Sequence, residues 1–233
     1  KQKGRTVIGW EEIIQRGKIN NPVVAVMWHN VKDTIQATET GHKAILTPAT
    51  HMYLDFPESK TPGEIKAATW MPPISLEKCY SMEINDYSEE STVLGVQGCF
   101  WSDQFIHGTV LQELPLLNEN RSENYAEYLT FPRLLAISEV GWSKMGNRNY
   151  EDFSRRISSH YSKLDYKECH YRVPEPEIVD MKNNSDGTVT FTLKSNVEGA
   201  KILYRTDGHY PNIHSSEYTA PVTVKSKDDF RAM

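Results

Sequence analysis

The sequence lacks long apolar runs and clusters of basic residues. No stretch approaches the roughly 18 consecutive apolar residues of a membrane-spanning helix, so no membrane-spanning segment is expected. The formal charge is −5 over 233 residues, without a Lys/Arg cluster. A nucleic-acid-binding face normally carries such a cluster, so nucleic acid is not an expected partner. The hydrophobic content of 38% is ordinary for a globular protein.

Cysteine is scarce as well. The three cysteines Cys79, Cys99 and Cys169 are odd in number and widely spaced. That pattern fits neither a disulfide framework nor a zinc site. The sequence therefore predicts no metal and no cofactor, and it leaves the redox compartment open.

The chain also has no start methionine and no signal peptide. It enters an apolar run at residues 6–10 almost at once, and it stops within a β-like pattern at Met233. We expect a piece of a longer protein, in which case the missing leader says nothing about location.

Residues 1–172 alternate between strand-like and helix-like patterns. Apolar, β-branched runs predict buried strands at residues 6–10, 22–28, 43–47 and 93–101. Helical patterns cover residues 11–18, 32–40, 74–82 and 122–142, with Pro132 expected to kink or split the last one. A further helix is predicted at residues 150–164. This alternation indicates an α/β fold with right-handed βαβ units and a parallel sheet.

The hydrophobic period changes to two near residue 173. Val189, Phe191 and Leu193 alternate with polar residues, and turn signals follow at residues 206–208 and 210–212. Residues 173–233 therefore predict a small all-β, sandwich-like domain.

An aromatic residue stands at or just beyond the C-terminal end of each of the four predicted strands. These residues are Trp10, Trp28, Tyr53 and Trp101, and carboxylates follow two residues after the last two, at Asp55 and Asp103. Such strand ends converge on one mouth in a parallel barrel. Aromatic faces stack on the apolar faces of a pyranose, and carboxylates accept hydrogen bonds from its hydroxyls, so the pattern predicts a sugar site.

We expect the tryptophans and histidines outside this strand-end pattern to have structural roles. Trp70 and Trp142 fall on no predicted strand end, and we assign them to the core. His29 and His51, taken alone, are also expected to be structural rather than catalytic.

The chain resembles the β-N-acetylhexosaminidases of family 20 of the glycoside hydrolases. The resemblance covers residues 1 to about 172 and rests on the stretches 7–12, 24–29, 53–55, 95–103 and 131–143. It implies the C-terminal half of a TIM (β/α)8 barrel. Residues 202–208 and 218–222 resemble the small β-domain that follows the barrel in many bacterial members.

The resemblance also implies roles for the strand-end residues. Tyr53 matches the tyrosine whose hydroxyl bonds the 2-acetamido oxygen of the substrate, which acts as the internal nucleophile of a retaining mechanism. Trp10, Trp28 and Trp101 match the aromatic box around the acetamido methyl group and the sugar ring. Asp55 and Asp103 match acidic positions that bind sugar hydroxyls, although the family more often has Glu at the position of Asp103.

One family feature is missing from the sequence. The family places an adjacent Asp-Glu pair, which orients the acetamido group and transfers the proton, at the end of the strand before that of Trp10. No Asp-Glu dipeptide occurs in this chain. We therefore expect this chain to be inactive by itself, because a general acid supplies about 10²–10⁴-fold in rate.

Two functions remain open at this stage. The first is a fragment of a β-N-acetylhexosaminidase that acts on terminal non-reducing N-acetyl-D-hexosamine residues of glycans. The second is a non-catalytic carbohydrate-binding or interaction module built on a half-barrel. The resemblance favours a periplasmic or extracellular location, and the open edges of a half-barrel predict self-association of the isolated chain.

Overall fold

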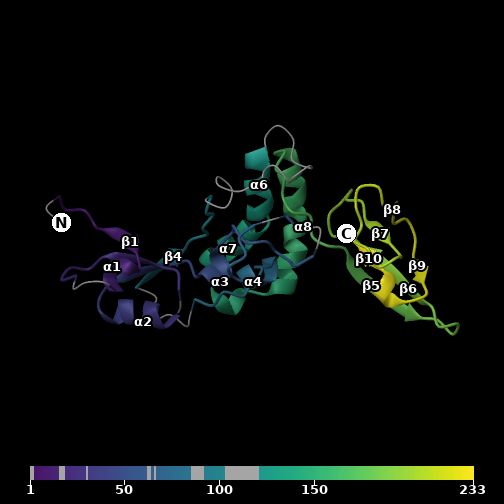
Figure 1. Ribbon diagram of the computed structural model, residues 1–233. Coiled ribbons are helices and arrows are strands. Elements are labelled where there is room, and N and C mark those ends of the chain that lie inside the picture. Colours follow the sequence, from purple (N-terminus) through teal and green to yellow (C-terminus); the bar gives the residue numbers. More distant parts are fainter. Residues whose placement is uncertain are drawn as a thin grey trace.

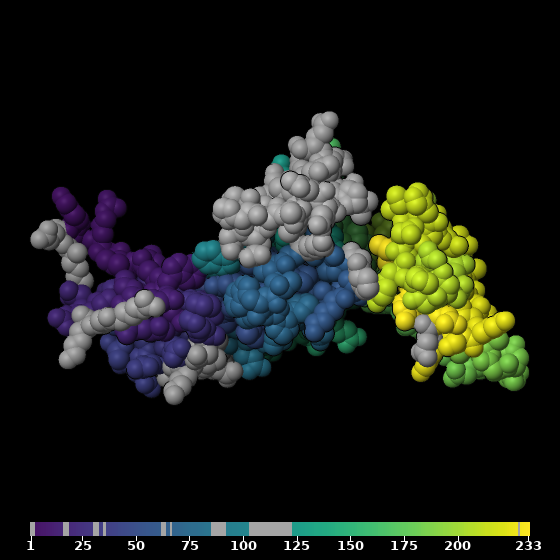
Figure 2. All heavy atoms as spheres, in the orientation of Figure 1, coloured from purple at the N-terminus to yellow at the C-terminus, as the bar shows by residue number. Residues whose placement is uncertain are grey.

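The computed structural model describes residues 3–15, 19–29, 31–61, 64–65, 67–84, 92–102 and 121–233 (Figure 1). A parallel sheet with helices α1 and α2 lies at one end of the molecule. Further helices occupy the middle, and an antiparallel β unit forms the other end. The space-filling view shows this β unit as a lobe that adjoins the helical part (Figure 2).

The predicted parallel sheet is confirmed. Its strands follow the order β1-β2-β3-β4 and pair in parallel throughout. They are β1 (Ile8–Trp10), β2 (Val24–Met27), β3 (Lys43–Leu46) and β4 (Val93–Val96). The connecting helices are α1 (Glu12–Gln15), α2 (Val31–Glu39), α3 (Ala49–Met52) and α4 (Leu76–Tyr80). Helices connect the strands because parallel neighbours cannot be joined by tight turns.

Local sequence signals explain where several helices begin and end. Gly41 follows α2 with φ of +85°, a conformation that glycine adopts without steric cost. Ser75 caps α4 by accepting a hydrogen bond from the main-chain N–H of Lys78 at 3.1 Å. This helix covers residues 76–80 only, so it is shorter than the predicted 74–82.

Pro132 splits the long helix predicted for residues 122–142. Helix α6 (Arg121–Thr130) ends before it, and α7 (Arg133–Trp142) begins directly after it. The break follows from the missing N–H of proline. After the 3-10 turn η2 (Met145–Asn147), helix α8 (Tyr150–Tyr166) begins at an Asn149 cap. It buries Phe153, Ile157, Tyr161 and Leu164, as the helical period predicts.

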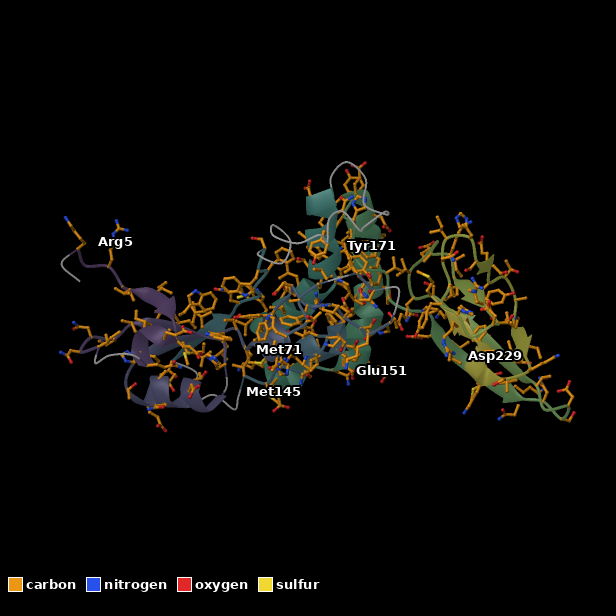
Figure 3. All side chains as sticks on the ribbon, in the orientation of Figure 1. Arg5, Met71, Met145, Glu151, Tyr171 and Asp229 are labelled. Atoms are coloured by element: carbon orange, nitrogen blue, oxygen red, sulfur yellow. The ribbon has the colours of Figure 1, made fainter. Side chains whose placement is uncertain are left out.

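The two faces of the parallel sheet have different environments. Ala25, Met27, Ala44 and Leu46 are 0–2% exposed and belong to the main hydrophobic core. An open hollow of about 720 Å³ lies at the other face, lined in part by Ile8, Val24, Lys43 and Leu94. Arg5, which also lines it, lies near the free N-terminal end of the chain (Figure 3).

Exposed apolar side chains mark the open regions of this unit. Val7, Ile8 and Leu94 are 46%, 61% and 52% exposed. Trp142, at the end of α7, is 92% exposed, so its assignment to the core was wrong. The helical period of α7 instead buries Ala136, Ile137 and Val140 and turns Trp142 away from them.

The C-terminal unit is a sandwich of two three-stranded antiparallel sheets, ordered β10-β7-β8 and β5-β6-β9. Its strands are β5 (Glu177–Asn183), β6 (Val189–Lys194), β7 (Leu203–Arg205), β8 (Ser216–Glu217), β9 (Val222–Val224) and β10 (Arg231–Ala232), with the 3-10 turn η3 (Lys227–Asp229) before the last. The alternating residues predicted from the sequence form its core. Phe191 of β6 stacks on Phe230, with ring centroids 4.5 Å apart.

The junction between the two units is packed. Val197, from the C-terminal unit, is buried in the main hydrophobic core of the α/β unit, and Ala200 packs against that core. Arg172 donates to Glu64 at 2.9 Å, and its guanidinium also pairs with Glu175. The domain boundary at residues 172–173 stays a prediction.

Arg133 fastens the irregular segment between α3 and α4 to the helices. Its side chain is fully buried and donates to the carbonyl oxygens of Leu54 (2.8 Å), Ile74 (3.0 Å) and Leu129 (3.1 Å). Glu58 lies 3.7 Å from its Nε atom, in the same buried cluster. Burial raises the pKa of the Glu58 carboxyl, and the positive charges of Arg133 and Arg172 counteract that shift.

Replacement of Arg133 should therefore destabilise the fold strongly. Arg133→Met leaves three buried carbonyls without their donor and leaves Glu58 with Arg172 as its remaining cationic partner, so we expect a loss of about 3–5 kcal/mol in the free energy of unfolding. Urea denaturation measures the change. Arg155→Met is the matched control: its side chain is 75% exposed, and its surface ion pair is worth about 1 kcal/mol or less. Equal losses in both variants would contradict this role for Arg133.

Candidate functional site

The predicted strand-end residues line one cavity. Trp10 is the last residue of β1, Trp28 follows β2 directly, and Tyr53 and Trp101 lie beyond β3 and β4. The cavity has a volume of about 560 Å³. Its lining residues are Trp10, Glu12, Trp28, Tyr53, Asp55, Trp70 and Trp101.

Aromatic rings form the walls of this cavity and contact one another. Tyr53 lies in the middle, with its ring centroid 6.3 Å from Trp28 and 6.0 Å from Trp101. The Trp28 and Tyr53 rings are nearly parallel, at 19°. Trp10 and Trp101 approach to 5.4 Å. These ring contacts make the wall of the cavity predominantly aromatic, with the polar groups of Glu12 and Asp55 also in the lining.

Tyr53 is held by the main chain as well as by rings. It forms a parallel bridge with Cys99, in which the Leu54 N–H donates to the Cys99 carbonyl (2.6 Å) and the Cys99 N–H to the Met52 carbonyl (2.8 Å). Burial raises the pKa of the Tyr53 hydroxyl, with smaller contributions from Cys99, Asp55 and Glu11, while a side-chain hydrogen bond with Trp101 lowers it. The phenol is therefore protonated at neutral pH and remains a hydrogen-bond donor.

The structure describes one of the two predicted carboxylates, Asp55. Asp55 is 4% exposed and lines the cavity two residues after Tyr53. Burial raises the pKa of the nearby Tyr125 hydroxyl, and the charge of Asp55 adds to that rise. Asp103 lies outside the described residues, so its predicted place beside Trp101 stays a prediction.

Sequence analysis missed the role of Glu11 and Glu12 in the structure. Glu11 is fully buried and accepts hydrogen bonds from the main-chain N–H groups of Trp28 (2.8 Å) and His29 (3.2 Å). It also contacts His29 Nδ1. The structural role expected of His29 stays a prediction. Glu12 accepts a hydrogen bond from the Trp28 indole at 3.1 Å. The position of both glutamates directly after a strand-end tryptophan was the available signal.

Trp70 was assigned to the core, and that assignment was wrong. It is 57% exposed and lines the cavity. Its ring packs edge-on against Phe56 (4.9 Å) and Tyr53 (6.2 Å). Trp70 lies on the irregular segment between α3 and α4, where periodicity carries no signal.

The lining of this cavity combines aromatic faces with a few hydrogen-bond acceptors. Four tryptophans and a tyrosine supply stacking faces, while Asp55 and Glu12 supply hydrogen-bond acceptors. Within the described ranges, no three His, Cys, Asp or Glu side chains gather closely enough to hold a metal ion. None of the helices in those ranges is long and apolar enough to cross a membrane.

Family comparisons match both units of the chain. Residues 1–145 match the model of the glycosyl hydrolase family 20 catalytic domain. Residues 182–233 match the chitobiase/beta-hexosaminidase C-terminal domain. The two matches fall in the α/β unit and in the β sandwich, respectively.

Individual relatives agree with these matches. A beta-hexosaminidase of Porphyromonas gingivalis is 26% identical over 94% of this chain, and one of Akkermansia muciniphila is 29% identical over 68%. The chain spans 27% and 30% of the lengths of these relatives.

A comparison with solved structures supports the same family through the fold. An exo-β-N-acetylglucosaminidase from Vibrio harveyi, determined in complex with N-acetylglucosamine, superposes with a TM-score of 0.61 at 25% identity. The match covers 73% of this chain and 25% of that one, and it supports the barrel assignment of the α/β unit. Because the catalytic-domain model matches more than half of the 233 residues, the chain belongs to family 20 of the glycoside hydrolases.

Proposed function

We propose that this chain, completed by the remaining part of a family 20 barrel, hydrolyses terminal non-reducing N-acetyl-D-hexosamine residues of glycans with retention of configuration. The observation that carries the proposal is the central position of Tyr53 in the aromatic cavity. Residues 1–172 form the barrel part in this proposal, and residues 173–233 form the β-domain.

Tyr53 acts on the 2-acetamido group in this mechanism. Its protonated hydroxyl donates a hydrogen bond to the acetamido carbonyl oxygen, which attacks the anomeric carbon and forms an oxazolinium intermediate. Trp10, Trp28 and Trp101 enclose the acetamido methyl group and the ring, which excludes water and holds the nucleophile in an attack geometry. Asp55, and Asp103 beyond the described residues, bind the sugar hydroxyls.

The proton-transferring groups have no counterpart in this sequence, which contains no Asp-Glu pair. The chain thus supplies residues that hold the substrate, and the complete barrel supplies the acid and base. We accordingly propose that the isolated 233-residue chain has no useful turnover.

Loss of the Tyr53 hydroxyl should lower turnover in the complete protein. Tyr53→Phe removes one oriented donor to a developing charge, so kcat on an aryl N-acetylglucosaminide should fall by about 10²-fold or more. Steady-state kinetics measure this fall. Tyr166→Phe is the control, because Tyr166 is 88% exposed, and it should leave kcat unchanged. An unchanged kcat for Tyr53→Phe would remove Tyr53 from the mechanism.

The complete protein should also require the 2-acetamido group. The cavity wall is apolar, and the nucleophile belongs to the substrate, so an aryl glucoside with a 2-hydroxyl lacks both the fitting group and the attacking oxygen. We expect kcat/KM on the aryl glucoside to be at least about 10³-fold lower than on the matching N-acetylglucosaminide, because the glucoside lacks the intramolecular attacking group. Parallel assays on the two glycosides test it, and equal values would sink the proposed mechanism.

We further propose that the isolated chain self-associates through the open face of its parallel sheet. This surface includes the exposed apolar side chains of Ile8 and Leu94, and β1 and β4 are the edge strands of the described sheet. Each square ångström of apolar surface removed from water contributes about 25 cal/mol, so burial between copies is favourable. In the complete protein, the rest of the barrel covers this face instead.

Sedimentation velocity of the isolated chain at micromolar concentration tests this association. We expect species larger than a monomer, and we expect Ile8→Glu to shift them toward monomer because it places a charge on the face. Ile213→Glu, at an equally exposed position (67%) of the β unit, should not. A wild-type chain that sediments as a monomer would overturn the proposal.

A further inference from the structure

Two carboxylates support one wall of the aromatic cavity: Glu11 is fully buried, and Glu12 lies in the lining itself. Glu11 and Glu12 come directly after β1, and both carboxylates bind the Trp28 segment at the end of β2. We propose that these glutamates are positioning residues for Trp28, in which Glu11 fixes the main chain and Glu12 fixes the ring. The inference rests on the proposed function in that Trp28 is there a wall of the sugar site.

Glu11 extends the sheet beyond its last strand pair. The ladder between β1 and β2 ends at Trp10 and Val26, and the Glu11 N–H still donates to the Val26 carbonyl at 3.0 Å. Beyond this point, Glu11 Oε2 accepts the main-chain N–H groups of Trp28 and His29. Those groups would otherwise lack a strand partner from β1, and a buried polar group without a partner is destabilising.

The carboxylate of Glu11 is saturated with donors. Besides the two main-chain N–H groups, Oε1 accepts a hydrogen bond from Gln15 Nε2 at 3.1 Å and contacts His29 Nδ1. A fully buried carboxylate is tolerated only when its oxygens are paired in this way. Since every one of these contacts is internal, Glu11 acts on a ligand only through the Trp28 segment.

Glu12 determines how the Trp28 ring is turned. The indole Nε1–H donates to Glu12 Oε1 at 3.1 Å, which occupies the polar edge of the ring. The indole is then free to present carbon atoms to the cavity, and its face lies nearly parallel to the Tyr53 ring. Without this bond the ring gains rotational freedom about its side-chain torsions, and the Trp28 wall loses its fixed orientation.

The Trp28 indole N–H provides a direct readout that needs no substrate. In ¹⁵N-tryptophan-labelled chain, Trp28→Phe identifies its indole signal. Glu12→Ala should shift that signal and speed its hydrogen exchange at least about tenfold, because a charge-assisted hydrogen bond is lost. Glu12→Gln keeps an acceptor oxygen and should restore protection. Glu39→Ala, at the exposed end of α2, is the matched control and should leave the signal unchanged.

The same spectra test Glu11 through the main-chain N–H of Trp28. Glu11→Gln keeps one acceptor oxygen and removes the negative charge, so this N–H should exchange faster. Unchanged protection of the indole in Glu12→Ala, or of the main-chain N–H in Glu11→Gln, overturns the corresponding half of the proposal.

Kinetics of the complete protein separate positioning from direct sugar contact. Glu12→Ala should raise KM for an N-acetylglucosaminide about tenfold, the equivalent of one such hydrogen bond, and Glu12→Gln should restore it. A raised KM with an unchanged indole signal would show that Glu12 touches the sugar itself, which overturns the inference. A changed indole signal in a protein that hydrolyses no N-acetylhexosaminide would support the positioning role and contradict the proposed function.

Discussion

A single buried guanidinium anchors the segment that supplies three of the seven described residues lining the cavity. Arg133, at the start of α7, binds the carbonyls of Leu54 and Ile74, which lie at the two ends of an irregular segment. Trp70 lies between these two points, and Tyr53 and Asp55 flank the first of them. Main-chain hydrogen bonds within the described part of this segment satisfy the carbonyls of Asp55 and Pro57. The carbonyls of Leu54 and Ile74 instead accept from Arg133, which therefore ties both ends of the segment to α7.

Much of the fold was predictable because burial leaves a period in the sequence. The run around β2 is apolar throughout because all four of its residues are buried, and α8 repeats its apolar residues at helical spacing. The gathering of the strand-end aromatic residues in one cavity was also predictable, since the C-terminal ends of parallel strands lie at the same edge of a sheet. Trp10, Trp28, Tyr53, Asp55 and Trp101 accordingly line one cavity, although their roles toward a sugar remain proposals.

The errors fall where position depends on distant contacts rather than on period. Trp70 enters the cavity because of its contacts with Phe56 and Tyr53 and the anchoring of its segment, none of which leaves a local pattern. Trp142 is the exception, because the helical period of α7 turns it away from the buried Ala136, Ile137 and Val140, and its apolar residue type alone suggested the core. The buried carboxylate of Glu11 looked like a helix residue because its partners lie 17 and 18 positions further along the chain.

The residues that form the cavity walls differ in how easily sequence changes can move them. Moving Trp10 or Trp28 would require a new register in the sheet, and every side chain on the strand would change faces. Trp70, by contrast, stands on a segment that is clamped at Leu54 and Ile74. Insertions or deletions between those clamps leave both attachment points in place. Relatives can therefore diversify the width and character of this one wall by loop length alone, while the sheet-borne walls remain fixed.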